Sequence, residues 1–190
     1  ELNVRGSREG SVEVIRRNMA LIRRRIKSPT LVFEMMVIGE RSNTDICLCY
    51  LSDKASPKLL EDVKKRLKAV KLNTILESGY LQPFFEGSGG WFFSECGTCE
   101  RPGSFAAKLY EGRIGILVDG TPFALTVPYL FIENFQTLDD YTQKPFYALF
   151  IRIVRLAAYF ITLFLPGAYV AIASYSPELL PSSLLLNLAA

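Results

Sequence analysis

The sequence predicts a soluble α/β domain, with a mixed sheet and helices, that runs into a transmembrane α-helix. Charge divides sharply along the chain, because Glu178 is the only charged residue after Arg155. Before Arg155, the spacing of apolar residues changes between the helical period and the alternation typical of strands. The chain starts at Glu1 and stops within an apolar run, so we expect an excerpt of a larger membrane protein.

A helix and a hairpin are predicted at the start of the chain. Ser11 is suited to cap a helix that begins at Val12, because apolar residues then step by three and four positions. Residues 31–38 and 44–51 alternate in polarity as strands do. Turn-forming residues separate these two stretches, which favours a hairpin.

The middle of the chain predicts helices around an irregular stretch. Ser56 followed by Pro57 is typical of a helix start, and a shorter helix is expected around residues 73–81. Residues 82–100 place glycines among aromatic side chains, a composition typical of a packed excursion or a contact surface. Another helix is expected over residues 102–111.

A second hairpin is predicted from strands over residues 114–118 and 123–127. The connection between them was also weighed as a phosphate-binding loop, but it lacks the glycine spacing and the lysine of such a loop. We therefore interpret it as a structural turn made of Asp119, Gly120, Thr121 and Pro122. The order of elements favours one α/β layer pair with a mixed sheet over residues 1–128.

The rest of the chain is predicted to enter a membrane. Residues 129–150 are rich in aromatic side chains, which favour the membrane–water interface, and are expected to form an interfacial linker. Residues 151–175 are expected to form the first transmembrane helix, because residues 156–175 cross about 30 Å without a charge. Residues 176–190 would start a further membrane segment. The alternative is a buried core helix of a soluble protein.

Two residue pairs orient and shape this predicted membrane helix. Arg152 and Arg155 precede the apolar stretch, so the positive-inside rule places the α/β domain in the cytosol. Pro166 and Gly167 lie near its middle, where they should kink or weaken the helix. We expect this pair to act as a gating hinge in a helix bundle or pore, although proline and glycine are also generally enriched in membrane helices.

Few groups are available for chemistry. The chain has no histidine, which removes the commonest general base and zinc ligand. The cysteines allow unpaired thiols, a disulfide between Cys96 and Cys99 or a metal site, and the first is favoured; they are Cys47, Cys49, Cys96 and Cys99. We predict no catalytic residue, cofactor or metal. The net charge of +3 gives no reason to expect nucleic acid as a partner.

Arginines cluster on the first predicted helix. They could contact anionic lipid headgroups or a protein partner, or form a solvated helix face; they are Arg16, Arg17, Arg23, Arg24 and Arg25. Three classes of function remain open on these residues. They are a signalling or channel subunit, a membrane-bound enzyme whose site lies outside this excerpt, and a lipid-tethered scaffold.

Several short motifs occur together in an order that resembles the A-subunit family of spore germination receptors (the GerA type). The motifs are Gly6-Ser-Arg-Glu-Gly10, Asn18-Met-Ala-Leu-Ile-Arg-Arg-Arg-Ile-Lys27, Ile75-Leu-Glu-Ser-Gly-Tyr80, Glu100-Arg-Pro102, Glu111-Gly-Arg-Ile-Gly-Ile-Leu-Val-Asp-Gly-Thr-Pro-Phe123 and Ser176-Pro-Glu178. The chain departs from the family at Ser7, where proline is usual, and across residues 87–99, where a more polar loop is expected. No role for the cysteines follows from the resemblance.

The resemblance implies the second lobe of a cytosolic N-terminal region, followed by the first helix of a multi-pass protein of the spore inner membrane. It implies a receptor complex with a transporter-like B subunit and a lipoprotein C subunit. It further implies a homo-oligomer that acts as an ion channel and transduces nutrient sensing into germination. A related accessory protein of sporulation, stage V sporulation protein AF, shares the same motifs and is the alternative.

Overall fold

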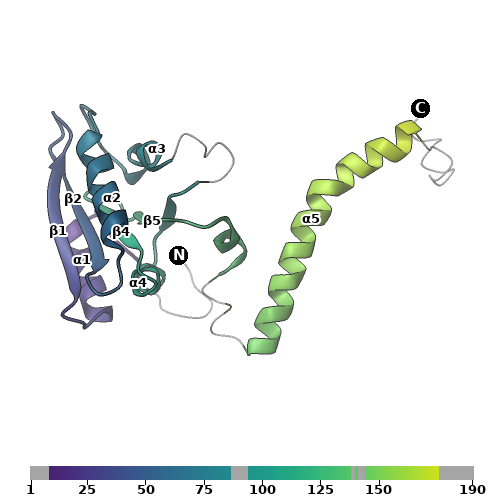
Figure 1. Cartoon of the computed structure of the whole chain (residues 1–190), viewed down its shortest axis with the longest axis horizontal. Coiled ribbons are helices and arrows are strands. Elements are labelled where there is room, and N and C mark those ends of the chain that lie inside the picture. The colour runs from purple at the N-terminus through teal and green to yellow at the C-terminus, as the bar shows by residue number, and fades with distance from the viewer. Residues whose placement is uncertain (1–8, 87–93, 138–139, 141–143, 176–190) are drawn as a thin grey trace. The chain divides into compact units, whose positions relative to one another are not determined.

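The computed structural model describes residues 9–86, 94–137, 140 and 144–175 (Figure 1). The chain divides into two compact units, Glu1–Asn134 and Phe135–Ala190. The elements in chain order are α1 (Ile15–Arg25), β1 (Leu31–Ile38), β2 (Thr44–Leu51), α2 (Pro57–Ala69), η1 (Ser78–Tyr80), α3 (Gln82–Phe85), β3 (Gly97–Cys99), α4 (Pro102–Tyr110), β4 (Ile114–Val118), β5 (Ala124–Val127), η2 (Phe131–Phe135) and α5 (Pro145–Tyr175).

The first unit is built on a five-stranded sheet in the order β1-β2-β4-β5-β3. Its four pairings are antiparallel, whereas the sequence led us to expect a mixed sheet. The long connection from β2 to β4 explains the difference, because it starts and ends at the same end of the sheet. The carbonyl of Lys54, after β2, lies against Gly112, before β4. A chain that returns at the same end produces an antiparallel neighbour.

Helices cover both faces of this sheet, rather than the one face of the expected layer pair (Figure 1). The alternation of side chains along β2 supplies both cores. Ile46, Leu48 and Tyr50 pack with α2 and α3. Cys47, Cys49 and Leu51 pack with α1 and α4. Strand β2 is therefore buried on both faces from Ile46 to Leu51, although the sequence predicted alternating polarity there.

The first helix starts three residues later than the sequence predicts. Val14 occupies the cap position of α1, and Ser11 does not cap the helix. Residues 11–13 are instead held in an extended connection, in which Ser11 N–H donates to the carbonyl of Glu100 at 2.9 Å. The side chain of Asn18 exchanges two hydrogen bonds with the backbone of Val12. Tertiary contacts thus override the local capping signal at Ser11.

The stretch between α2 and α4 also differs from expectation. The helix expected around residues 73–81 is only the 3₁₀ turn η1, and the short helix α3 follows it. Strand β3, which the sequence did not predict, lies at the edge of the sheet and pairs with β5. The glycine-rich part of the irregular stretch, residues 87–93, lies outside the described residues.

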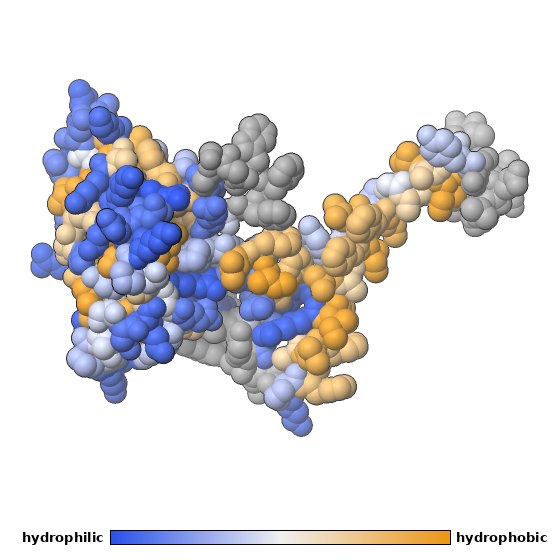
Figure 2. Space-filling view, viewed as in Figure 1, coloured by the Kyte–Doolittle hydropathy of each residue, from blue (hydrophilic) through white to orange (hydrophobic). Residues whose placement is uncertain are grey.

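The second unit contains α5, a helix of 31 residues that begins at Pro145. It starts six residues before the predicted position, so it includes the last part of the expected interfacial linker. At 1.5 Å per residue the helix is about 46 Å long, which exceeds the roughly 30 Å of a hydrocarbon core. Among the described residues, it alone is long and apolar enough to cross a membrane. Figure 2 shows hydrophobic residues along most of its length.

Candidate functional site

Three charged side chains hold the last residues of the first unit in place. Lys108 lies on α4, Arg113 lies just before β4, and Glu133 lies in η2; we call them the exit cluster. Arg113 forms an ion pair with Oε1 of Glu133, and Lys108 Nζ lies 3.4 Å from Oε2 of the same carboxylate. The cluster therefore joins a helix and a strand of the domain to the segment that leads to α5.

The exit cluster is largely shielded from water. The Arg113 and Glu133 side chains are only 13% and 12% exposed. Burial raises the pKa of Glu133, but hydrogen bonds from Arg113 and from the backbone N–H of Leu130 outweigh it and lower the pKa below its ordinary value. Glu133 is therefore charged at neutral pH. Its negative charge offsets the buried positive charges of its two partners.

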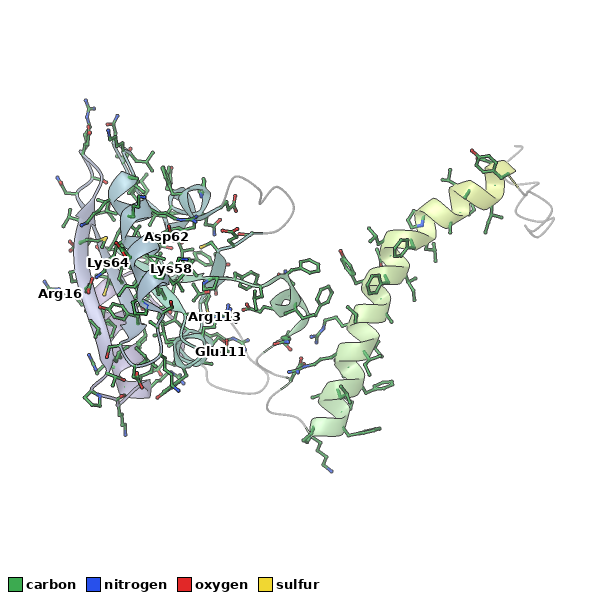
Figure 3. All side chains as sticks on the ribbon, viewed as in Figure 1. Arg16, Lys58, Asp62, Lys64, Glu111 and Arg113 are labelled. Atoms are coloured by element: carbon green, nitrogen blue, oxygen red, sulfur yellow. The ribbon has the colours of Figure 1, made fainter. Side chains whose placement is uncertain are left out.

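Other contacts complete the attachment of this segment. Arg113 also donates to the carbonyl of Pro128 at 3.2 Å and pairs with Glu111 at 2.9 Å (Figure 3). The Tyr129 ring lies 4.7 Å from Lys108 Nζ, in cation–π geometry. The same ring packs so closely on Gly97 that a Cβ at this glycine would lie 2.2 Å from it. Residues 128–133 are thus held on the domain although β5 has already ended at Val127.

A second charged group organises the start of the second unit. Asp140 accepts hydrogen bonds from Arg152 Nε at 3.2 Å and from Arg155 Nη1 at 3.4 Å. Arg155 also donates to the carbonyl of Phe135. Burial raises the pKa of Asp140, but hydrogen bonds from Thr137, Arg155 and Arg152 outweigh it and lower the pKa to about 2. The two predicted orientation residues therefore share one carboxylate, and we call this group the helix anchor.

The helix anchor leaves the positive-inside argument intact. That rule counts lysine and arginine residues near a span, and acidic residues contribute little to it. Arg152 and Arg155 remain the basic residues that precede the charge-free stretch of α5. The orientation that they indicate stays a prediction.

The predicted hinge residues lie within α5, which stays helical through them but changes direction in its second half (Figure 1). Pro166 has no N–H to donate to the carbonyl of Thr162. The hydroxyl of Thr162 donates to the carbonyl of Ala158 at 2.8 Å, so it is engaged one turn earlier. A Cβ at Gly167 would meet nothing within 4 Å. The described part of this chain therefore gives no steric reason for a glycine at this position.

The residues of the predicted turn take a tertiary role that the sequence did not indicate. Asp119 accepts a hydrogen bond from the N–H of Ile15 at 3.0 Å, across 104 positions of sequence. Gly120 donates its N–H to the carbonyl of Glu13 at 2.9 Å, and Gly120 has a φ of +85°. Thr121 is buried and its hydroxyl accepts from the N–H of Phe123. A carboxylate at the N-terminus of α1 also offsets the helix dipole.

The arginines of α1 divide into two groups. Arg24 and Arg25 pair with Glu9, at 2.6 and 3.2 Å. Arg23 donates to the carbonyls of Ser28 and Leu31, and lies 5.0 Å from the centre of the Phe33 ring. Arg16 and Arg17 have exposed side chains (Figure 3 labels Arg16). Because Arg23 and Arg24 are exposed too, a lipid or partner surface on this helix would include them together with Arg16 and Arg17.

The four cysteines are free thiols distributed over both cores. Cys47 and Cys49 lie side by side on the same face of β2, with their sulfurs 3.8 Å apart. Cys96 packs in the core beneath α2, whereas Cys99 packs in the core beneath α1 and α4. Burial raises the pKa of Cys96 to about 12. Cys96 and Cys99 face opposite sides of the sheet, as expected for residues three apart in an extended chain.

The described residues contain no group of three histidine, cysteine, aspartate or glutamate side chains that could hold a metal ion. The ionisable groups that converge, in the exit cluster and the helix anchor, are paired acids and bases and lie beside backbone carbonyls. Such arrangements hold segments in position. Glu133 and Asp140 were not singled out from the sequence, because no local pattern links an acid to a base twelve to twenty-five residues away.

Comparison with known proteins identifies the family. Residues 1–190 match the family described as "Bacillus/Clostridium GerA spore germination protein". The chain belongs to this family. The family includes the A subunit of a germinant receptor and is non-enzymatic, so a membrane-bound enzyme is not retained among the possible functions.

Curated relatives in Bacillus subtilis (strain 168) align along the chain. Spore germination protein KA is 40% identical over 190 residues, which are 100% of this chain and 35% of that protein. Spore germination protein B1 is 37% identical over 189 residues, 100% of this chain and 39% of that protein. The uncharacterized membrane protein YfkQ is 39% identical over 189 residues, 100% of this chain and 37% of that protein. This chain thus spans well under half of these relatives and is part of a membrane protein.

A solved structure supports the architecture of the first unit. It is the crystal structure of the N-terminal domain of the A subunit of the Bacillus megaterium spore germinant receptor GerK3. The two chains are 42% identical, with a TM-score of 0.53, and the match covers 65% of this chain and 98% of that chain. The α/β fold of the first unit is therefore confirmed, and this chain's own structure shows the long apolar helix that follows it in sequence.

Proposed function

We propose that this chain forms the second lobe and the first membrane helix of a germinant-receptor A subunit, which takes part in converting nutrient sensing into spore germination. The observation that carries the proposal is the GerA family match over residues 1–190. The similarity to the A-subunit domain of the GerK3 receptor supports it independently at 42% identity.

The A subunit acts in this proposal as an ion-channel component. α5 supports this role, because it presents an apolar surface that the described chain leaves largely uncovered. A helix with a proline near its middle needs neighbours or a cavity to satisfy the freed carbonyl. We propose that copies of this subunit, or further spanning segments of the same protein, provide those neighbours in the spore inner membrane.

The α/β domain faces the cytosol in this proposal, and the receptor includes a transporter-like B subunit and a lipoprotein C subunit. Arg152 and Arg155 support the orientation. The exposed arginines of α1 would provide the charge for contact with anionic lipid or with a partner. An accessory protein like stage V sporulation protein AF is the alternative assignment.

A genetic experiment separates these assignments. Spores without other germinant receptors would carry the full-length protein alone or together with its proposed B and C subunits, and loss of refractility would be followed after addition of single nutrients. The proposal predicts a response to at least one nutrient only when all three subunits are present. An accessory protein would give no nutrient response in this background, but would change the rate of a response that another receptor mediates.

A further inference from the structure

The exit cluster lies at a particular place in the chain, directly before the boundary between the two units. The first unit ends at Asn134, one residue after Glu133. The second unit begins at Phe135, whose carbonyl accepts a hydrogen bond from Arg155 of the helix anchor. Two charged groups therefore flank the boundary, one in each unit.

The segment before the boundary owes its position to these side chains. The sheet pairing of β5 ends at Val127, and Pro128 has no N–H for a further ladder bond. From there the described backbone contact back to the domain is the hydrogen bond from Tyr129 N–H to the carbonyl of Glu95 at 2.8 Å. Beyond Tyr129, Glu133 attaches the segment through Arg113 and Lys108, and the Tyr129 hydroxyl donates a hydrogen bond to Asn134 at 3.0 Å.

The burial of this cluster points to a role in fixing position. Surface ion pairs contribute little to stability, and burying charges carries a desolvation cost that can exceed the attraction between them. Glu133 receives contacts from three directions: Lys108 of α4, Arg113 before β4 and the N–H of Leu130. Contacts from several elements determine where a side chain lies far better than a single pair does.

We infer that Glu133 is a positioning residue for signalling: it makes residues 128–134 move as one body with the α/β domain, so that the connection towards α5 starts from a fixed point. The inference rests on the proposed function, because coupling has a consequence only if a signal passes between the two units. In this role the cluster stays intact during signalling. A movement of α4 and β4 then displaces Asn134 as well, because the segment before it is rigidly attached to the domain.

Two full-length variants test the inference in spores that contain this subunit with its B and C partners. Glu133→Gln keeps the shape of the side chain and an acceptor for Leu130, but removes the charge that Arg113 and Lys108 share. A Gly-Ser insertion between Asn134 and Phe135 keeps every charged side chain but lengthens the connection at the last residues of η2. Asp62→Asn is the matched control, because it removes an ion pair with Arg66 on the exposed side of α2 (Figure 3).

Receptor level in the membrane and the nutrient concentration for half-maximal germination would be measured for each. We expect both variants to reach normal levels and to need about tenfold more nutrient, within the roughly 5- to 150-fold range of coupling between sites. Asp62→Asn should match the wild type. If Glu133→Gln lowers the receptor level, its nutrient sensitivity cannot be compared with the wild type. The sensitivity of the insertion variant then tests the inference.

Normal level together with normal sensitivity, in either Glu133→Gln or the insertion variant, would overturn the inference and leave the exit cluster a stabilising contact. A wild-type receptor that responds to no nutrient would instead count against the proposed function. That result depends on the wild type alone and not on the variants. The two failures are therefore distinguishable in one set of strains.

Discussion

The carboxylate of Asp140 binds two arginines of α5. Its side chain is buried, and it accepts from Arg152 and Arg155 on the helix and from Thr137 before it. Hydrogen bonds to a charged acceptor typically contribute about 1.5–3 kcal/mol each when the partner is well placed. A single side chain thus joins residues 135–140 to the first turns of α5.

Acid should release this attachment. The pKa of Asp140 is about 2 in the folded protein and about 3.9 in an unfolded chain. A lowered pKa means that the stabilisation is complete above about pH 4 and is lost as the pH falls towards 2. We therefore expect pepsin, which is active in this range, to cut the aromatic segment around residues 131–150 of the solubilised protein increasingly between pH 4 and pH 2.

Asp140→Asn provides the matched comparison. The variant should already be susceptible at pH 4, and its cleavage at this segment should change little towards pH 2, after correction for the activity of pepsin on a denatured substrate. Asp62→Asn should behave as the wild type. Equal pH dependence in Asp140→Asn and wild type would show that another group controls the segment.

At the scale of single elements, the role of Pro166 and Gly167 in α5 can be tested by substitution. The helix is continuous through Pro166, and a side chain at Gly167 would meet open space. Replacing both residues by alanine should therefore leave insertion normal, since alanine favours the helix by about 3 kcal/mol over proline and about 1 kcal/mol over glycine. Any effect must arise from neighbours of α5 in the assembled receptor.

We expect Pro166→Ala combined with Gly167→Ala to reach the membrane at normal levels and to change the rate of nutrient-triggered germination severalfold. The single variant Gly167→Ala tests close helix approach alone, because it keeps the proline. Normal germination by the double variant at a normal level would mean that Pro166 and Gly167 only reflect the general composition of membrane helices.

The elements that could be predicted are those defined by local signals. The hairpin strands over residues 31–38 and 44–51 and the strand over 114–118 are confirmed with the expected bounds, because alternation, apolar runs and turn residues mark them. Strand β3 is only three residues long, and it is a strand because it pairs with β5. No local pattern could have identified it.

The candidate site was less predictable for the same reason. Arg152 and Arg155 were found from their place beside an apolar stretch, but their partner Asp140 lies in a segment that the sequence marks only as aromatic. Asp119 was assigned to a turn, whereas its contact with Ile15 depends on how α1 lies across the sheet. Glu133 lies in a stretch without a regular pattern, and its partners Arg113 and Lys108 are distant in sequence. Only the fold brings the three side chains together.

At the scale of the whole molecule, topology can be tested with one introduced thiol. Ser56 is exposed directly before α2, and Cys47, Cys49 and Cys96 are buried, with burial raising the pKa of the Cys96 thiol to about 12. Cys99 is only partly buried, so the experiment uses a Cys99→Ser background, in which labelling of the remaining described thiols should be low. We expect Ser56→Cys to react with a membrane-impermeant maleimide only after the membrane is opened. Strong labelling of the intact membrane would place the α/β domain outside.

We propose that this GerA-family chain belongs to a receptor subunit through which nutrients open an ion pathway. This can be tested by the release of monovalent cations from spores in the first minutes after nutrient addition, with and without the full-length protein as the sole A subunit. We expect nutrient-triggered release only when the protein is present, with altered kinetics in the Pro166→Ala, Gly167→Ala variant. Equal release from spores that lack the protein would contradict it.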